Sequence, residues 1–380
     1  MKRILCNVLA AVATTVMCVS AFAAEIAFDF RENGSAGGRG AYQVLATKEA
    51  SATGLLRTHR VKVEAPAADV AVAAGDTLTF RLFDDRTFRI QIVESLPSVT
   101  EAESWIGVAE GYDETFNSVV VRTESGWQLD VQDFQNGLSY RVYTADGVAT
   151  VSEFDLSAMT PRCGSSRERV SPARHRRAAM VAAETPKHTP AADTAASTYV
   201  DILVCFDKSA QTWCSKNSTT PASFAATAVA KMNTALANTG LDTKFRYRLA
   251  GTYNVNGTGG SDLGELIDAC WGEYGPNRDS FVYNGTDWSV VKAKRDEVGA
   301  DLATVLVDIG GNDTDLLITG IGDCPSAYEY MTAEYTYSCC AIAFVAIDHT
   351  LTHEVGHNMG CDHPDSTLVN SDYISPGPGV

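Results

Sequence analysis

The stretch HEVGHNMGCDH, residues 353–363, holds three of the seven histidines of this 380-residue chain. Residues four apart on a helix lie on one face, so the imidazoles of His353 and His357 can reach the same ion. Gly360 can take a left-handed conformation that ends the helix and turns the chain back, which would bring His363 round as a third ligand. The spacing therefore predicts a helix, a turn and a metal site made of three imidazoles.

Zinc is the cofactor that this set of side chains predicts. Three neutral imidazoles and one open position are what a catalytic zinc needs, whereas a structural zinc is usually closed by four protein ligands. Glu354 lies beside the first ligand, where it can take the proton of a zinc-bound water and pass it to a leaving amine. A lone HExxH also arises by chance in ordinary helices, but here five fixed positions agree. His349 lies outside the spacing, and we expect it to be structural.

Around this stretch, strands and helices alternate from about residue 199 onward. Apolar and β-branched runs predict strands over 199–206, 244–250, 302–307 and 339–347. Helical spacing predicts helices over 222–238, which Gly240 closes, and over 290–298. Alternation of this kind predicts an α/β domain over residues 199–380.

The preceding part of the chain, about residues 24–160, reads as a β-rich domain. Its predicted strands cover 76–83, 87–93, 119–122, 127–131 and 138–143. Asn136 and Gly137, between the last two strands, are a strong hairpin signal. No catalytic residue types gather in this domain, and its only histidine is His59, so chemistry is expected in the second half of the chain.

Composition changes sharply between the two parts. Arg174, His175, Arg176 and Arg177 form a basic cluster, and a stretch rich in Ala, Thr and Pro follows without apolar periodicity. Proteases cut in such exposed segments, so an activating protease at this basic linker is an expected partner. A solvated tether that is never cut is the alternative.

The N-terminus has the pattern of a secretory signal. Residues 1–3 are Met-Lys-Arg, residues 4–19 are almost wholly apolar, and residues 21–23, Ala-Phe-Ala, form a small-x-small cleavage site. A membrane anchor is the alternative, but the apolar run is short and ends in a cleavage site instead of a charged stop. We therefore expect a signal peptide over residues 1–23, a secreted or cell-envelope protein, and no stable membrane insertion.

Net charge limits the class of partner. The chain carries 47 acidic and 30 basic residues, a formal charge of −17. A protein of this charge repels a phosphate backbone, so nucleic acid is not an expected partner.

The motif of residues 353–363 resembles that of the metzincin zinc endopeptidases, whose pattern HExxHxxGxxH is present in full. Upstream, residues 199–206 and 338–344 look like the first and edge strands of a reprolysin or adamalysin-like catalytic domain. The resemblance implies a mixed sheet with an active-site helix, zinc on the three histidines, and a protein or peptide substrate. In that family the edge strand pairs with extended substrate, which implies a docking edge at residues 339–345.

Three features depart from the family pattern. Pro364 follows the third histidine where adamalysins usually have Asp, a choice closer to serralysins. Metzincins have a methionine turn beneath the zinc, and no methionine follows His363; Met359 lies inside the motif and is expected in the core. No calcium or accessory-domain pattern follows. A catalytically impaired zinc-binding or adhesion protein with a shortened metzincin fold is therefore the alternative function.

The sequence Pro161-Arg162-Cys163-Gly164 resembles the cysteine switch of matrix metalloproteinase propeptides. In that device a thiolate, which is a good zinc ligand, takes the fourth zinc position and keeps water out. The resemblance implies that Cys163 is a metal ligand in a latent precursor. A disulfide-bonded Cys163 is the alternative.

Ten cysteines in an exported chain predict disulfide bonds. Two of them leave with the signal, and setting Cys163 aside leaves an odd number. One thiol is therefore expected to stay unpaired, or to have had its partner in a lost C-terminal part. Cys361 lies inside the motif but not at a ligand position, and we expect it in a disulfide.

Together these patterns predict a secreted zinc metalloendopeptidase made as a zymogen. Residues 1–23 would be the signal, 24–177 a β-rich propeptide with the cysteine switch, 178–198 a linker and 199–380 the catalytic domain. Glu354 would act as general base and then as general acid. A zinc amidase that acts on cell-wall peptides is a third possibility, although such enzymes share these ligands less often.

Overall fold

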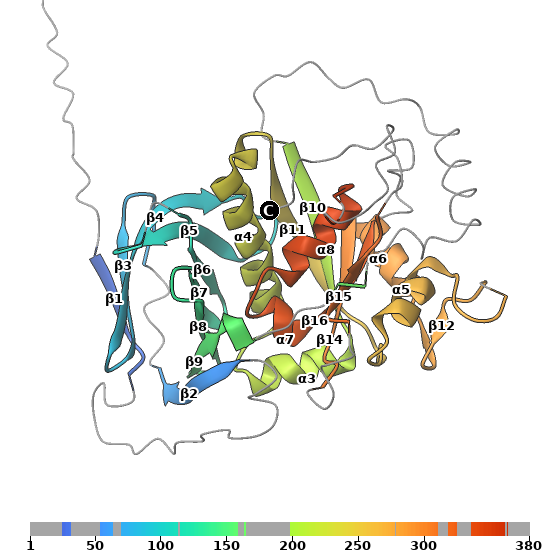
Figure 1. Ribbon diagram of the computed structural model, residues 1–380, viewed down its shortest axis with the longest axis horizontal. Coiled ribbons are helices and arrows are strands. Elements are labelled where there is room, and N and C mark those ends of the chain that lie inside the picture. Colours follow the sequence, from blue (N-terminus) through green and yellow to red (C-terminus); the bar gives the residue numbers. More distant parts are fainter. Residues whose placement is uncertain are drawn as a thin grey trace, which may run out of the picture.

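The computed structural model describes residues 25–31, 54–63, 70–112, 115–158, 163–164, 198–277, 279–310, 318–324, 336–361 and 363. We call residues 25–164 the N-terminal part and residues 198–363 the C-terminal part. Each part contains one large sheet, and a long helix lies between the two sheets (Figure 1). None of the helices in these described ranges is long and apolar enough to cross a membrane.

The sheet of the N-terminal part has the strand order β1-β3-β4-β5-β6-β7-β8-β9-β2. All neighbouring pairs are antiparallel except β1 and β3, which are parallel. The strands are β1 (Glu25–Asp29), β2 (Leu55–Lys62), β3 (Thr77–Phe83), β4 (Arg86–Leu96), β5 (Glu103–Ala109), β6 (Ser118–Thr123), β7 (Gly126–Asp133), β8 (Leu138–Ala145) and β9 (Val148–Asp155), followed by the 3-10 helix η1 (Leu156–Ala158). The predicted hairpin at Asn136 and Gly137 joins β7 to β8, and the five predicted strands are confirmed.

Strand β7 is buried on both faces although its sequence alternates. Trp127, Leu129 and Val131 belong to the apolar core of the N-terminal part. The polar residues between them, Gln128 and Asp130, are also almost fully buried. Alternation in β7 therefore separates two buried environments instead of separating core from solvent.

The sheet of the C-terminal part has the strand order β11-β10-β14-β16-β15. Its strands are parallel except β15, which runs antiparallel to β16, so the sheet is mixed as expected. The strands are β10 (Thr198–Phe206), β11 (Phe245–Asn254), β14 (Leu302–Val307), β15 (Gly320–Gly322) and β16 (Tyr337–Ala341), with a separate small hairpin of β12 (Val282–Tyr283) and β13 (Thr286–Asp287).

The helices of the C-terminal part are α3 (Lys208–Lys216), α4 (Pro221–Thr239), α5 (Leu263–Trp271), α6 (Ser289–Val298), α7 (Ile342–Val345) and α8 (Thr350–Asn358), with the 3-10 helix η3 (Leu241–Thr243). Helix α4 starts where the Thr220 side chain accepts a hydrogen bond from the Ser223 N–H and Pro221 occupies the first turn. It ends at Gly240, whose φ of 71° only glycine adopts at little cost. These signals confirm the helix predicted over residues 222–238.

The strand predicted over residues 339–347 is wrong in its second half. Strand β16 ends at Ala341, and Ile342–Val345 form helix α7. Almost the whole run is buried. A continuous apolar run has neither a strand period nor a helix period, so the pattern could not locate the point where the strand ends.

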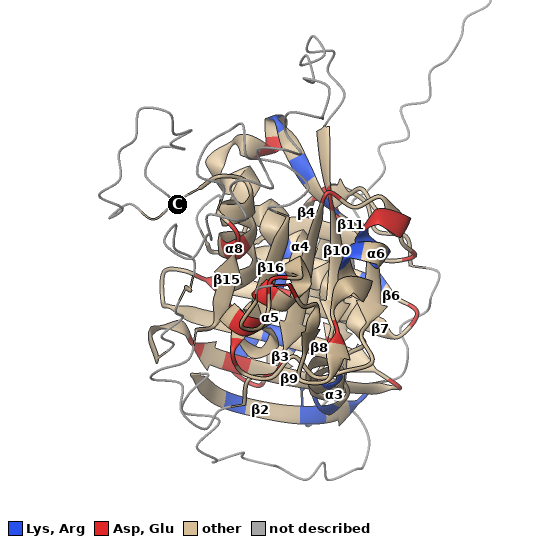
Figure 2. Cartoon of the chain, turned by 90° about the vertical axis from the view of Figure 1, so that its right-hand side faces the viewer, with Lys and Arg blue, Asp and Glu red and all other residues tan. Residues whose placement is uncertain are grey.

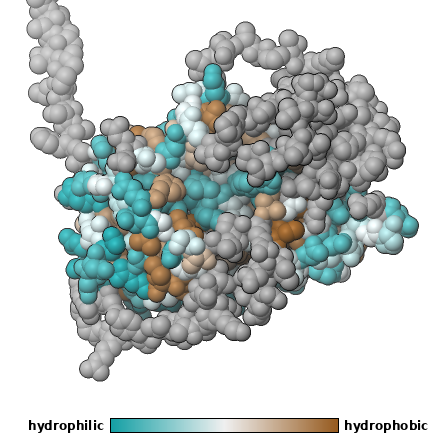
Figure 3. Space-filling view, in the orientation of Figure 1, coloured by the Kyte–Doolittle hydropathy of each residue, from teal (hydrophilic) through white to brown (hydrophobic). Residues whose placement is uncertain are grey.

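The described surface mixes residues of different character. Acidic and basic residues are interspersed along the elements drawn in Figure 2. Hydrophilic and hydrophobic residues are likewise mixed over the visible described surface in Figure 3. The exposed large apolar side chains come from both parts of the chain: Leu56, Val93, Val99, Phe134, Tyr199, Leu241 and Val282. Neither charge nor hydropathy therefore marks a binding face on the sides of the molecule seen in Figures 2 and 3.

Candidate metal centre

Helix α8 packs against strands β15 and β16 and carries His353 and His357. Its first turn is held by Asp348, whose Oδ1 accepts hydrogen bonds from the Thr350 N–H at 2.8 Å and from the Thr350 hydroxyl at 2.6 Å. Val355 is buried in a core shared by the two parts of the chain. With one face of the helix in the core, the two histidines four residues apart share another face.

A tight turn after α8 brings the third histidine back. Gly360 has a φ of 91°, and the Cys361 N–H donates a hydrogen bond to the Gly356 carbonyl at 2.9 Å. A side chain at this φ would be strained, so the turn requires glycine. As the spacing predicted, the chain reverses here and carries His363 back over the helix.

The backbone carbonyl of Cys361 orients the ring of His357. It accepts a hydrogen bond from Nδ1 of that ring at 2.8 Å. A proton on Nδ1 leaves the lone pair of Nε2 free, which is the form of imidazole that binds a metal ion.

Four donor atoms converge at this place. Nε2 of His353 lies 3.1 Å from Nε2 of His357 and 3.1 Å from Nε2 of His363. Sγ of Cys163 lies 3.3 Å from Nε2 of His357. All four atoms lie within 4.8 Å of one another, so these side chains could hold one metal ion.

Cys163 reaches the cluster from the end of the N-terminal part. It forms a parallel β-bridge with Gly320, and the Gly164 N–H donates a hydrogen bond to the Gly320 carbonyl at 2.8 Å. Gly164 fits closely, because a Cβ there would lie 2.7 Å from Cδ1 of Ile318. Residues 163 and 164 therefore lie along the outer edge of β15, and the thiol points at the histidines.

Glu354 lies under strand β15 and is only 1% exposed. A Cβ on Gly320 would lie 2.5 Å from Oε1 of Glu354, and a Cβ on Gly322 would lie 2.2 Å from its carbonyl oxygen. Oε2 of the same carboxylate lies 3.5 Å from Sγ of Cys163. The two glycines thus let the edge strand lie directly on α8 and hold this carboxylate beside the donor cluster.

His353 is exposed on one side, but desolvation of the rest of its ring, and to a lesser extent the nearby ring of His363, lower the pKa of His353 below its ordinary value. Both effects disfavour the charged imidazolium. They therefore favour the neutral form that a metal ion requires.

The structure brings together every residue that the sequence singled out for the site: Cys163, His353, Glu354, His357 and His363. His349 lies elsewhere. Its ring stacks on Phe134 of the N-terminal part, with the ring centroids 6.4 Å apart, and its Nδ1 lies 3.2 Å from the Thr352 hydroxyl.

The docking edge expected at residues 339–345 is wrong. Strand β16 lies between β14 and β15, so its backbone groups are already paired on both sides. The edge beside the donor cluster is β15, which sequence reasoning missed. Its signal was the Gly-x-Gly spacing of Gly320 and Gly322, since glycine within a strand often marks a close approach of another backbone.

The expected disulfide bonds are absent from the described residues. None of the described cysteines forms a disulfide bond there: Cys163, Cys205, Cys214, Cys270, Cys324, Cys339, Cys340 and Cys361. Six of these are buried and pack as small apolar side chains. Burial raises the pKa of Cys205, Cys214, Cys339 and Cys340, which keeps these groups protonated. Cys361 contributes its backbone carbonyl to the site instead of a disulfide half.

Three predictions lie outside the described residues. They are the signal over residues 1–23, the basic linker that contains residues 174–177, and the question of a methionine turn after His363.

No protein-family model and no curated protein matches the chain. Among solved structures, the chain is similar to metalloproteinase-II from Bacteroides fragilis, with 10% sequence identity over 78% of this chain and 84% of that one and a TM-score of 0.40. A second similar structure is that of a chaperone-substrate complex, with 18% identity over 24% of this chain and 78% of that one and a TM-score of 0.21. Both likenesses are remote, and what the site can do is inferred from its own residues.

Proposed function

We propose that the chain is a secreted zinc-dependent endopeptidase made as a zymogen. The observation that carries the proposal is the convergence of Nε2 of His353, His357 and His363 beside the buried carboxylate of Glu354. Three imidazoles on one ion, with a carboxylate next to the remaining position, are the donor set of a hydrolytic metal site.

The spacing of the donors suits zinc. Zn–N bonds of about 2.0–2.1 Å and Zn–S bonds of about 2.3 Å place the donors of a tetrahedral site about 3.3–3.7 Å apart. The nitrogens of His353 and His357 are 3.1 Å apart, and the sulfur of Cys163 is 3.3 Å from His357. Neutral imidazole and thiolate are also ligands that zinc prefers.

Bound zinc would supply a Lewis acid that lowers the pKa of water to about 7 and polarises a peptide carbonyl. The proton transfers would belong to Glu354. Its Oε2 lies 3.5 Å from Sγ of Cys163, and that sulfur stands where solvent would enter. Glu354 would take a proton from the attacking water and deliver it to the leaving amine.

Latency would come from Cys163, whose position obstructs catalysis in two ways. Its thiolate would take the position that solvent needs. The backbone of residues 163–164 also occupies the outer edge of β15 at Gly320. When this segment leaves, an extended peptide substrate could pair with the same edge through main-chain hydrogen bonds.

Export and activation complete the proposal. The basic start, apolar run and small-x-small site of residues 1–23 support secretion. The basic cluster at residues 174–177 supports cleavage by an activating protease, which would cut the chain after Cys163 and before the strand β10.

Replacing Cys163 tests the proposal without any proteolytic step. The full chain with Cys163→Ala should digest casein or a peptide library about 10-fold or more faster than the unmodified chain, which corresponds to about 1.4 kcal/mol of latency. A zinc chelator should abolish this activity. Metal content, measured by mass spectrometry, should be one zinc per chain.

Cys361→Ala is the matched control, because this partly exposed thiol lies near the same site but contributes no donor sulfur. It should leave the chain latent. A Cys163→Ala chain that binds one zinc and cleaves no protein would favour the zinc-binding or adhesion protein. Release of peptides from muropeptides, with casein intact, would favour the amidase.

A further inference from the structure

Helix α4 is buried around its whole circumference. Every residue from Ser223 to Thr234 is buried. A helix on the surface of a globular protein keeps one polar stripe in water, whereas a helix buried on all sides lies inside a core. Helix α4 therefore needs cover on two opposite sides.

The two sheets supply that cover. One apolar core contains residues of α4 together with residues of both parts of the chain. From the C-terminal part, β11 contributes Tyr247 and Leu249. From the N-terminal part come Ile106 of β5 and Val119 and Val121 of β6. In Figure 1, α4 lies between β5 and β11 accordingly. The N-terminal part therefore completes the core around α4.

Aromatic contacts continue this core along α3. The ring of Tyr143, on β8, lies edge-on to Phe224 of α4 at 6.0 Å and to Trp213 of α3 at 6.4 Å between centroids. The buried guanidinium of Arg141 lies 5.3 Å from the centroid of the Trp213 ring and donates a hydrogen bond to Asn217 at 3.3 Å. Such pairs stabilise an interface beyond the area they bury.

A buried ion pair crosses between the two parts. Nζ of Lys231, on α4, lies 3.6 Å from Oδ2 of Asp130 on β7, and the side chains are only 4% and 1% exposed. The same ammonium donates a hydrogen bond to the Val345 carbonyl at 2.8 Å. Removing Asp130 would leave the charge of Lys231 without its partner, which costs far more than losing a surface pair.

Polar contacts also cross at the rim. The guanidinium of Arg246, on β11, contacts both carboxylate oxygens of Glu94 on β4 at 2.8 and 2.9 Å. The amide of Asn238 pairs with the backbone of Phe116, accepting from its N–H at 2.8 Å and donating to its carbonyl at 2.9 Å. The orientation of the two parts against each other is thus fixed by specific hydrogen bonds as well as by apolar packing.

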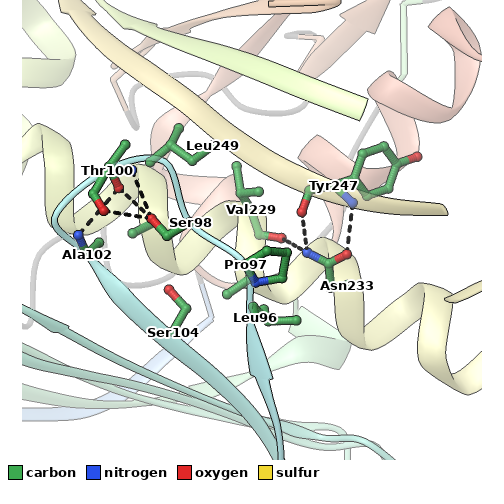
Figure 4. A pocket seen from close by; sticks show the side chains of 12 residues that line it. Leu96, Pro97, Ser98, Thr100, Ala102, Ser104, Val229, Asn233, Tyr247 and Leu249 are labelled. Carbon is green, nitrogen blue, oxygen red and sulfur yellow. Dashed lines mark hydrogen bonds between the residues drawn. The ribbon is translucent and has the colours of Figure 1, made fainter. Parts of the chain in front are cut away.

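The seam has a shallow recess of about 20 Å³, where the loop after β4 meets α4 and β11. In Figure 4, Leu96 and Pro97 of the N-terminal part line it together with Val229, Asn233 and Tyr247 of the C-terminal part.

We propose that the sheet of the N-terminal part, residues 25–158, is a permanent subunit of the protein. It stays bound to the C-terminal part after the linker is cut, while residues 163–164 leave the edge of β15. The proposal rests on the cut at residues 174–177 given under the proposed function. Its binding surface is the side of α3 and α4 that faces β5 to β8, and its partner is the chain's own N-terminal segment.

A chain with a designed cut site tests this proposal. Residues 174–177 are replaced by the recognition sequence of a sequence-specific protease, in a Glu354→Ala background that prevents self-digestion. After complete cutting at micromolar concentration, the two fragments should leave a size-exclusion column together, in a 1:1 ratio, at the volume of the uncut chain. Separate elution, or precipitation of either fragment, would overturn the proposal. Elution does not depend on peptidase activity, so failure of this proposal can be told apart from failure of the proposed function.

Variants of the cut chain identify the surface. Asp130→Asn should raise the Kd of the two fragments by about 100-fold or more, since it leaves a buried charge unpaired. Glu110→Gln is the matched control, because it removes an exposed ion pair with Arg89 inside the N-terminal part. Glu94→Gln, at the rim, is the second variant if Asp130→Asn prevents folding, and it should raise the Kd as well. If both Asp130→Asn and Glu94→Gln have the same Kd as the Glu110→Gln control, the assigned surface is refuted.

Discussion

Each imidazole of the donor cluster is positioned by a different local feature. The ring of His357 is oriented by the carbonyl of Cys361, which accepts a hydrogen bond from its Nδ1–H at 2.8 Å. His363 depends on the turn at Gly360, whose φ of 91° reverses the chain. His353 is exposed, and desolvation and the nearby ring of His363 lower its pKa, which favours the neutral form. A metal site built this way needs its backbone turn as much as its side chains.

Glu354→Gln separates metal binding from catalysis. The amide keeps the shape of the side chain but cannot accept a proton, so we expect one zinc per chain and a loss of about 10²–10⁴-fold in kcat. The variant is made in the Cys163→Ala chain, so that latency does not hide the effect. Metal content and peptide turnover are measured side by side.

The control is Glu297→Gln, which changes an exposed carboxylate on α6. It should match the Cys163→Ala chain in both measurements. Unchanged turnover in Glu354→Gln would remove this carboxylate from the mechanism.

At the scale of elements, the site depends on the close approach of strand β15 to helix α8. Gly320 and Gly322 have no side chains to separate the two, and any Cβ would collide with Glu354. Because Gly320 also bridges to Cys163, the same short strand positions both the carboxylate and the Cys163 thiol.

Gly322→Ala should therefore damage both the fold and the site. The added Cβ would lie 2.2 Å from the backbone oxygen of Glu354, so strand and helix must separate. Overpacking of this kind costs about 1–3 kcal/mol in the free energy of unfolding. Urea denaturation measures that loss, and zinc titration should show weaker metal binding.

Gly251→Ala in β11 is the matched control. A Cβ at that position meets nothing closer than 3.9 Å, so its effect on stability and on zinc binding should be small. If Gly322→Ala and Gly251→Ala lose the same amount of stability and zinc affinity, the close contact with α8 is not the reason for glycine at position 322.

The elements that sequence reasoning located best are those with a clear start, end or period. The strand predicted over residues 302–307 matches β14, and the capped helix α4 was placed to within a residue or so at each end. The donor residues were found because metal ligation requires fixed residue types at fixed spacing.

Features that depend on contacts between distant segments could not be predicted. The three-residue strand β15 has no apolar run, and its role comes from its neighbours in space. The polar face of β7 carries Gln128 and Asp130, which a local pattern assigns to solvent. Packing against α4 and the residue Thr219 before it buries that face. Disulfide counting likewise failed, because pairing depends on distance in the fold.

At the scale of the whole molecule, His349 lies at the contact between the two parts. Its ring stacks on Phe134 from the N-terminal part. Burial, followed by the charge of Lys231, lowers the pKa of His349 to about 3. The neighbouring Asp348 has a raised pKa, chiefly because of burial. Folding therefore keeps His349 neutral at pH values where an exposed histidine takes up a proton.

The stability contributed by this region should depend on pH. Between the unfolded pKa of about 6.5 and the folded value of about 3, the unfolded chain binds a proton at His349 that the folded chain does not. Stability should therefore fall as pH drops below about 6.5, by up to about 1.4 kcal/mol per pH unit, and less where solvent reaches the ring. The raised pKa of Asp348 acts in the opposite sense, since its contribution is lost as pH rises.

His349→Gln isolates the histidine from Asp348. Chemical denaturation of this variant and of the unmodified chain is compared from pH 7.5 down to pH 4.5. The difference in free energy of unfolding should shift steadily in favour of the variant as pH falls below about 6.5. A difference that stays constant over this interval would contradict the neutral, shielded state of His349.

Because α4 is enclosed on both sides, the order in which the chain leaves the ribosome matters. At about 5–20 residues per second, β9 is finished roughly 4–17 s before the last residue of α4 is added. The N-terminal sheet therefore has time to form before α4 is complete, and before β14, β16 and α8 have been synthesised. A C-terminal part made without the preceding sheet would leave the side of α4 that faces β5 and β6 exposed to water, which would favour aggregation.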